Sequence, residues 1–230
     1  MTLKRGISDW LKEYQLISDT WSGKLPECYK KISLSILEKV FMTVLIFIRS
    51  LSLVHIKEFF SSYKIRSEIS EFYVLAWFVV LLWLLWYPLS STAFLFVIVV
   101  YRLIDGLNYR LCIVFVDRYK RGWGLRSLNR SLLILMFNYC EIIIGFAILY
   151  LATYSIGYSN SNRIITTPIE ALYFSTVTIT TLGYGDMMPI SPLGQKLALL
   201  EPLLGFILVI LVIGVFLTGV RDIKEKTEED

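Results

Sequence analysis

Four apolar segments with very few charged residues constrain this chain more than any other feature of its sequence. They cover roughly residues 72–89, 91–104, 131–153 and 193–220. A helix that crosses the hydrocarbon core of a bilayer needs about 20 mainly apolar residues, and in lipid only helices and closed barrels satisfy the backbone. We therefore predict an all-α membrane protein with four transmembrane helices.

The composition agrees with this prediction. Of the 230 residues, 56% are hydrophobic and 18% are charged, whereas soluble domains carry about 25% charged residues. The aromatic and aliphatic content also excludes a disordered chain. The three cysteines show no CxxC spacing and His55 is the single histidine, which is too few residues for a zinc centre or a Ser-His-Asp mechanism. We predict no enzyme activity and no nucleic-acid partner.

Lysine and arginine positions indicate the orientation. With four spans, 21 of the 23 basic residues fall on the side of the termini, and only Arg163 and Lys196 fall on the other side. Positive charge collects on the cytoplasmic side of membrane proteins. We therefore predict a multi-pass protein of the plasma or inner cell membrane with both termini in the cytoplasm.

Residues 36–56 offer a fifth candidate span. Their apolar core, from Val40 to Ile48, is short and has charged residues on both sides. A fifth span would place one basic terminus outside. An interfacial or protein-packed amphipathic helix fits better than an inserted one, although the sequence leaves both open.

A short helix and a glycine-containing loop lie between the third and fourth segments. Thr167, Pro168 and Glu170 predict a helix start with a capping box. The helix continues to Thr180, and at 1.5 Å per residue its three turns cover about 15 Å, half a bilayer. It must therefore enter the membrane and return. The loop that follows reads Thr181-Leu182-Gly183-Tyr184-Gly185-Asp186.

Gly183 and Gly185 give this loop unusual chemistry. Glycines at alternating positions allow dihedrals that other residues avoid, so successive carbonyls can point the same way. Together with the hydroxyl of Thr181 they form a column of oxygens that can replace the hydration shell of a cation. The C-terminal end of the preceding helix also favours a cation. One loop gives too few oxygens at each level, so several copies must converge.

The segment resembles the pore loop of tetrameric potassium channels, whose filter reads T-x-G-Y-G-D after a short pore helix. The resemblance implies a homotetrameric pore, with the third span as outer helix, the fourth as inner helix, K+ as permeant ion and no organic cofactor. It implies that residues Thr181, Leu182, Gly183, Tyr184 and Gly185 form the filter, that K+ binds at the first four of these, and that Asp186 lies at the outer mouth.

The chain departs from the family pattern beside the filter. Tyr173 and Phe174 occupy the positions of the family's aromatic cuff, but Phe174 cannot donate a hydrogen bond to Tyr184. Val177 stands where some bacterial members have an acid. A partner for Asp186 must therefore come from elsewhere or be water.

The inner helix carries the family's gate features. Gly205 matches the glycine hinge. Counting from it, Phe206, Val209, Ile213 and Leu217 recur at helical spacing, and as pore-facing apolar rings they could close the pore by dewetting. Ordinary packing against lipid or helices is the alternative.

Glu201 and Glu141 are costly inside a membrane and are functional candidates for that reason. Glu201 could lie behind the filter and hydrogen-bond the pore helix, or be a protonated structural carboxyl. For Glu141, beside Asn138, a packing or hydrogen-bonding role is favoured over gating.

No span shows the regularly spaced arginines of a voltage sensor, so residues 1–70 and the loop 108–130 are the candidate regulatory regions. The loop could bind anionic lipid headgroups or simply reflect positive-inside topology. The predicted regions are an N-terminal cytoplasmic or interfacial helical region (1–70), a transmembrane hairpin (71–107), a basic interfacial linker (108–130), a pore domain (131–220) and a short cytoplasmic tail (221–230).

These features predict a potassium-selective channel that conducts passively, without an evident voltage sensor. A weakly selective cation channel with a relaxed filter is one alternative. A transporter or a non-conducting structural protein with four spans is another.

Overall fold

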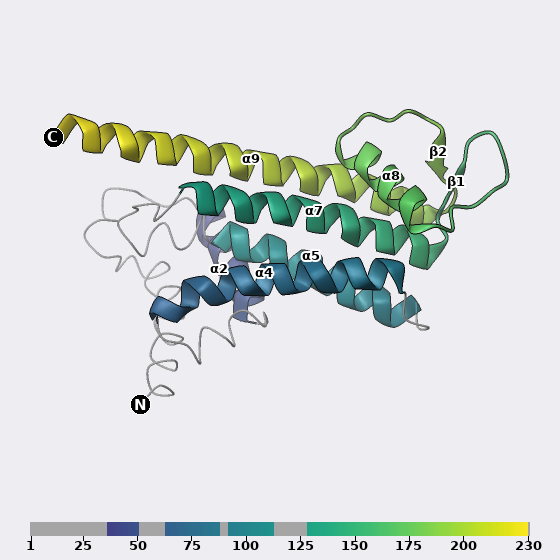
Figure 1. The fold of residues 1–230 in the computed structure, drawn as a ribbon, viewed down its shortest axis with the longest axis horizontal. Coiled ribbons are helices and arrows are strands. Elements are labelled where there is room, and N and C mark those ends of the chain that lie inside the picture. Colours follow the sequence, from purple (N-terminus) through teal and green to yellow (C-terminus); the bar gives the residue numbers. More distant parts are fainter. Residues whose placement is uncertain (1–35, 51–62, 88–91, 113–127, 230) are drawn as a thin grey trace. The chain divides into compact units, whose positions relative to one another are not determined.

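The computed structural model describes residues 36–50, 63–87, 92–112 and 128–229 (Figure 1). The chain divides into two units. One comprises residues 1–72 and 104–123, and the other comprises residues 73–103 and 124–230. The second unit contains the pore-loop motif and is the one that bears on function.

Helix α2 (Ile36–Ser50) belongs to the first unit. Within this helix the hydroxyl of Thr43 donates a hydrogen bond to the carbonyl of Lys39 at 2.7 Å. The apolar part, Lys39–Ile48, is shorter than a membrane span. The interfacial placement of residues 36–56 stays a prediction, and residues 51–56 lie outside the described part.

Two helices are long and apolar enough to cross a membrane: Leu132–Thr153 within α7 (Leu128–Thr153) and Pro192–Gly214 within α9 (Pro192–Glu229). They correspond to the third and fourth predicted spans. Helices α4 (Tyr63–Trp86) and α5 (Thr92–Cys112) coincide with the first two. Neither reaches the length and hydropathy of a clear span, because the apolar run of α4 begins only at Phe72 and α5 carries charges in its second half.

The core of the second unit forms around α7. This helix packs against α8 (Pro168–Ile179) and α9, and Tyr150 on α7 is completely buried. On another side, Gly145 of α7 lies against α5, where a Cβ atom would come within 3.1 Å of the Leu103 side chain. From α4, Phe78 packs edge-on against Phe137 at 5.4 Å between ring centroids. Helix α7 thus contacts α8 and α9 as well as the preceding helices α4 and α5.

The prediction of an all-α fold missed a small sheet. Strand β1 (Ile156–Tyr158) pairs antiparallel with β2 (Met187–Pro189), so that Gly157 lies opposite Met188. Three-residue strands are too short to show the alternation that identifies a strand in sequence. The sheet joins the end of α7 to the segment just after the filter motif.

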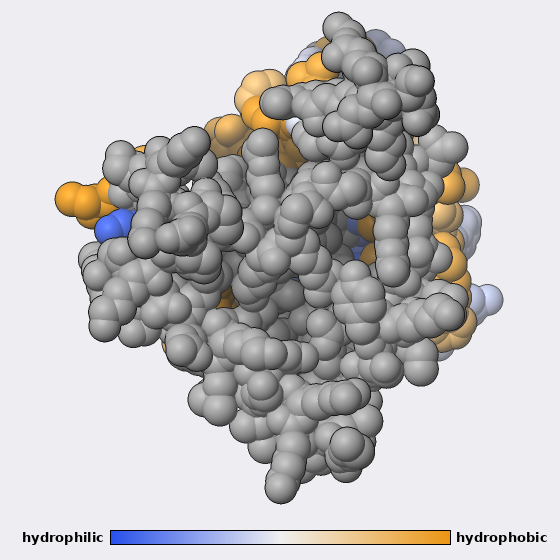
Figure 2. All heavy atoms as spheres, turned by 90° about the vertical axis from the view of Figure 1, so that its left-hand side faces the viewer, coloured by the Kyte–Doolittle hydropathy of each residue, from blue (hydrophilic) through white to orange (hydrophobic). Residues whose placement is uncertain are grey.

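Many large apolar side chains are exposed on the described helices. Most of the coloured surface in the space-filling view is hydrophobic (Figure 2). On α9, large apolar side chains such as Phe206 remain 65% exposed in the single chain. Such surfaces are characteristic of protein that is covered by lipid or by other chains.

Candidate filter and its support

Helix α8 begins as the sequence predicts. Thr167 is the N-cap, Pro168 is the first helical residue, and both hydrogen bonds of the capping box are present. The amide of Glu170 donates to the Thr167 hydroxyl at 3.3 Å, and the amide of Thr167 donates to the Glu170 carboxylate at 3.2 Å. Its 12 residues correspond to about 18 Å, so the helix reaches only partway through a bilayer.

Glu170 also ties this helix start to the preceding loop. Its carboxylate accepts hydrogen bonds from the Tyr158 hydroxyl at 2.9 Å and from the Thr166 amide at 3.1 Å, and it pairs with Arg163. Burial by itself would raise the pKa of Glu170, but the donated hydrogen bonds outweigh burial and lower the pKa to about 2. The carboxylate is therefore charged throughout the neutral range.

The loop after α8 has an alternating backbone. Residues Thr181, Gly183 and Gly185 have φ angles of 58°, 56° and 78°, whereas Leu182 and Tyr184 do not have positive φ. In a strand successive carbonyls point to opposite sides. A backbone that reverses handedness at every second residue can turn successive carbonyls toward one side, and the alignment of these carbonyls stays a prediction. At Thr181 the left-handed conformation also ends α8, because the amide of Leu182 donates to the carbonyl of Val177 at 3.0 Å. A β-branched residue is strained in this conformation.

The two glycines are required by conformation rather than by space. A Cβ atom at Gly183 or Gly185 would have no neighbour within 4 Å in the single chain. The side chains between them are open as well, since Leu182 is 58% and Tyr184 66% exposed. The loop has little cover from its own chain.

Tyr173 and Asp186 give the loop its side-chain contacts. The ring of Tyr173 stacks on that of Tyr184, with centroids 6.4 Å apart and planes 11° apart. The hydroxyl of Tyr173 donates to the Asp186 carboxylate at 2.9 Å. Asp186 therefore has a protein partner, which the sequence alone did not identify. Phe174 is buried and packs edge-on against Tyr150 at 5.0 Å instead.

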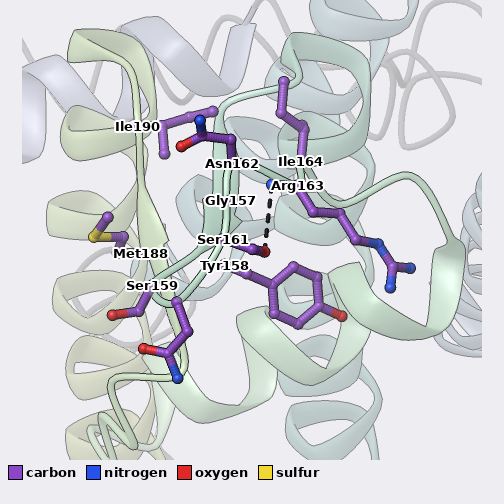
Figure 3. Close-up of a pocket in the computed structure, with 10 residues that line it drawn as sticks. Gly157, Tyr158, Ser159, Ser161, Asn162, Arg163, Ile164, Met188 and Ile190 are labelled. Atoms are coloured by element: carbon purple, nitrogen blue, oxygen red, sulfur yellow. Dashed lines mark hydrogen bonds between the residues drawn. The ribbon is translucent and has the colours of Figure 1, made fainter.

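The outer loop is fastened to the segment after the filter motif. The amide of Ser159 donates to the carbonyl of Asp186 at 2.9 Å, next to the β1–β2 pairing. An open cavity of about 530 Å³ lies beside this sheet. Figure 3 shows the side chains that line it. Two of the side chains that line this cavity contact each other: the guanidinium carbon of Arg163 lies 5.1 Å from the ring centroid of Tyr158. The lining residues are 157–164, Met188 and Ile190.

Glu201 lies behind α8, completely buried. The hydroxyl of Ser175 on α8 donates to one carboxylate oxygen, and the hydroxyl of Tyr150 on α7 donates to the other at 2.7 Å. The Ser175 oxygen also lies 2.8 Å from the carbonyl oxygen of Ile143, so its one hydroxyl proton is shared between two acceptors. One carboxyl thus joins the outer helix, the short helix and the inner helix. The contact with the short helix agrees with one of the two sequence interpretations of Glu201.

Sequence reasoning missed Tyr150 and Ser175. Tyr150 belongs to an apolar run, and Ser175 is one of several hydroxyl residues in α8, so neither stands out in the sequence. A usable signal existed: a buried glutamate in a membrane helix needs donors, and a tyrosine or serine on a neighbouring helix can supply them.

Helix α9 separates into a buried and an exposed row. Residues Glu201, Gly205, Leu208 and Leu211 face the protein. The four predicted gate residues, Phe206, Val209, Ile213 and Leu217, are 45–65% exposed in the single chain. The row is therefore open to other chains or to lipid.

Gly205 has a packing role that the hinge interpretation did not anticipate. A Cβ atom there would come within 2.6 Å of the Ile179 side chain at the end of α8. Helix α9 continues through this position and past Pro202 without interruption. The missing side chain lets the inner helix approach the end of the short helix; a hinge at Gly205 stays a prediction.

Glu141, the second membrane glutamate, is also buried. One guanidinium nitrogen of Arg102 on α5 lies 2.8 Å and 2.7 Å from its two carboxylate oxygens. Glu141 thus accepts hydrogen bonds from a partner that the sequence did not identify, and its role stays a prediction.

Comparisons with known proteins point to this same part of the chain. Residues 137–221 match the family described as ion channel. A voltage-gated potassium channel of Aeropyrum pernix is 36% identical over 63 residues, 27% of this chain and 21% of that protein. Two-pore potassium channel 5 of Arabidopsis thaliana is 32% identical over 85 residues, 36% of this chain and 21% of that protein.

A third relative, protein LctB of Geobacillus stearothermophilus, is 30% identical over 86 residues, 34% of this chain and 63% of that protein. No solved structure matches the chain. The chain spans about a fifth of the length of the two potassium channels named above. Residues 137–221 thus resemble an ion-channel family, and two of the relatives that the chain matches are named potassium channels.

Proposed function

We propose that this chain is one subunit of a homotetrameric channel that conducts K+ selectively and passively across a cell membrane. The observation that carries the proposal is the alternating left-handed backbone at Thr181, Gly183 and Gly185. It occurs in a loop that follows a half-length helix between two membrane-capable helices. A row of carbonyl oxygens presented this way suits a dehydrated cation.

In this proposal K+ binds to oxygens of Thr181, Leu182, Gly183 and Tyr184, with Asp186 at the outer mouth. The exposure of these residues in the single chain supports convergence of several copies. Tyr173 would fix the ring of Tyr184 through stacking and fix Asp186 through its hydroxyl. Glu201 would fix the short helix from behind.

The inner helix would form the cavity and the gate. The exposed apolar row of Phe206, Val209, Ile213 and Leu217 would line the pore below the filter and close it by dewetting. Gly205 would allow the bend. The helix in its present, continuous form corresponds in this proposal to an unbent state.

Four spans with both termini in the cytoplasm remain part of the proposal. Exposed apolar side chains on α4 and α5, including Trp83 and Val97, support contact of these helices with lipid. The basic loop 108–130 would face anionic headgroups on the cytoplasmic side; its residues 113–127 lie outside the described part.

Potassium flux into liposomes that contain the purified protein tests the proposal. We expect a barium-sensitive K+ flux in the wild type and none in Gly183→Ala, because a Cβ atom strains a residue with φ 56°. Gly214→Ala is the matched control, since a Cβ there meets nothing within 4 Å. Absence of K+ flux in a correctly assembled wild type would contradict the proposal.

A further inference from the structure

A buried ion pair lies between α5 and α7, away from the filter. The side chains of Arg102 and Glu141 are 2% and 5% exposed, and the nitrogen–oxygen distance is 2.7 Å. Two rings of α4 also enclose the guanidinium, Tyr73 at 5.1 Å and Trp77 at 5.5 Å from its carbon to the ring centroids. Three helices therefore surround one positive charge.

The pair lies deep in its helices. Arg102 is about 15 Å along α5 from Thr92, and Glu141 is about 18 Å from the end of α7 at Thr153, at 1.5 Å per residue. Both distances are about half of a 30 Å hydrocarbon core. Ionisable groups at such depth are expensive and usually functional.

Close packing between these helices does not require the charges. Phe78 packs on Phe137, and Gly145 makes room for Leu103. Apolar residues of similar volume in place of the ion pair would avoid its desolvation cost. Buried polar groups of this kind can instead specify register between helices. The pair therefore points to control of position rather than to stability alone.

Asn138 supplies the second observation. It is 1% exposed, and neither its amide nitrogen nor its amide oxygen has a hydrogen-bond partner in the described residues. It precedes Glu141 by three residues, so the two lie on the same face of α7. A buried amide without partners is rare in native proteins, and its oxygen is a good acceptor for a guanidinium.

We propose that Glu141 and Asn138 are alternative partners of Arg102, and that the exchange slides α5 along α7 and changes the open probability of the pore. Three residues of α7 correspond to about 4.5 Å, and helices are known to shift past one another in steps of this size. Helix α7 is also linked to the helices beside the filter motif. Its residue Tyr150 donates a hydrogen bond to Glu201 on α9 and packs against Phe174 on α8, so a shift of α7 relative to α5 can be transmitted to the pore. This inference rests on the proposed channel function.

Disulfide trapping tests the slide without requiring conduction. In a cysteine-free background, Leu103→Cys with Gly145→Cys reports the present register, because these side chains adjoin. Leu103→Cys with Ile142→Cys reports the shifted register, three residues along α7. We expect both pairs to cross-link in tetramers in liposomes, and Asn138→Leu to abolish the second cross-link while leaving the first.

Single-channel recording tests the consequence. Asn138→Leu removes one partner and Glu141→Asn weakens the other, so they should shift open probability in opposite directions, by about tenfold each, at unchanged unitary conductance. The cysteine-free protein is the control for these recordings. In it Cys140, an exposed residue of the same turn of α7, is replaced. The inference would be overturned if the Leu103→Cys/Ile142→Cys cross-link did not form, or if it still formed in Asn138→Leu. It would also be overturned if Asn138→Leu and Glu141→Asn shifted the open probability in the same direction. Absence of current in a wild type that still cross-links in both registers would count against the channel function alone.

Discussion

Two glutamates lie buried in the second unit, and their partners differ. Glu201 accepts hydrogen bonds from two neutral hydroxyls, whereas Glu141 is paired with the charged Arg102. Glu201 requires only hydrogen-bond donors from its neighbours. Glu141 also compensates the positive charge of Arg102, so removing Glu141 leaves that charge buried and unpaired.

The two sites also differ in what they join. Glu201 connects α7, α8 and α9 directly behind the filter motif, while Glu141 connects α7 to α5, away from that motif. The same residue type in the same kind of helix therefore has two distinct structural roles. The partner, rather than the carboxyl, determines the consequence of substitution.

Removing one member of the ion pair should give the largest loss of stability. Glu141→Leu leaves Arg102 buried and uncompensated, at a cost of about 3–5 kcal/mol. The double variant Arg102→Leu/Glu141→Leu should recover most of this loss, because no charge remains to be compensated. Denaturant unfolding of the detergent-solubilised protein measures both. A double variant as unstable as the single one would contradict the comparison.

Close packing beside Glu201 should give the next largest effect. In Gly205→Ala the new methyl group meets the Ile179 side chain, and overpacking of this kind costs about 1–3 kcal/mol. In Gly214→Ala the new methyl group meets nothing within 4 Å in the single chain, so the melting temperature of the protein should stay unchanged. Equal effects of the two alanines would show that the approach of α9 to α8 is not constrained at Gly205.

The hydroxyls that bond Glu201 should each contribute less. Tyr150→Phe removes one hydrogen bond to Glu201, and Ser175→Ala removes another together with the contact to the Ile143 carbonyl; a hydrogen bond is worth about 1 kcal/mol. Because both donate to one carboxyl, the double variant should depart from additivity. Thermal melting and the rate of current inactivation measure the effect, with the exposed Tyr154→Phe as control. Strict additivity would indicate that Glu201 does not couple the three helices.

A third glutamate, outside the membrane helices, should respond to pH instead. Glu170 has a pKa of about 2 in the folded protein, below its usual 4.5. Its contribution to stability is therefore complete above pH 4.5 and is lost as the pH falls through 2. We expect the acid side of the stability profile to flatten in Glu170→Gln. A profile identical to that of the wild type would contradict this assignment.

Local signals in the sequence predicted the pore motif well. The capping box at Thr167 and Glu170 and the alternating backbone around Gly183 depend on neighbouring residues alone. For that reason they were visible without any knowledge of the tertiary fold.

Long-range contacts account for what the sequence did not reveal. Glu201 and Glu141 were recognised as unusual, but their donors lie 51, 26 and 39 residues away along the chain. The space beside Gly205 depends on Ile179 in another helix. The strands β1 and β2 were too short to show a period. Each of these features requires the packing of elements that sequence patterns describe only one at a time.

Ion selectivity tests the central claim most directly. Reversal potentials of the wild-type channel in planar bilayers, with K+ on one side and Na+ on the other, report the ratio of the two permeabilities. The proposed filter predicts a reversal potential close to the K+ equilibrium value. A reversal potential near zero would contradict K+ selectivity and would indicate a weakly selective cation pore.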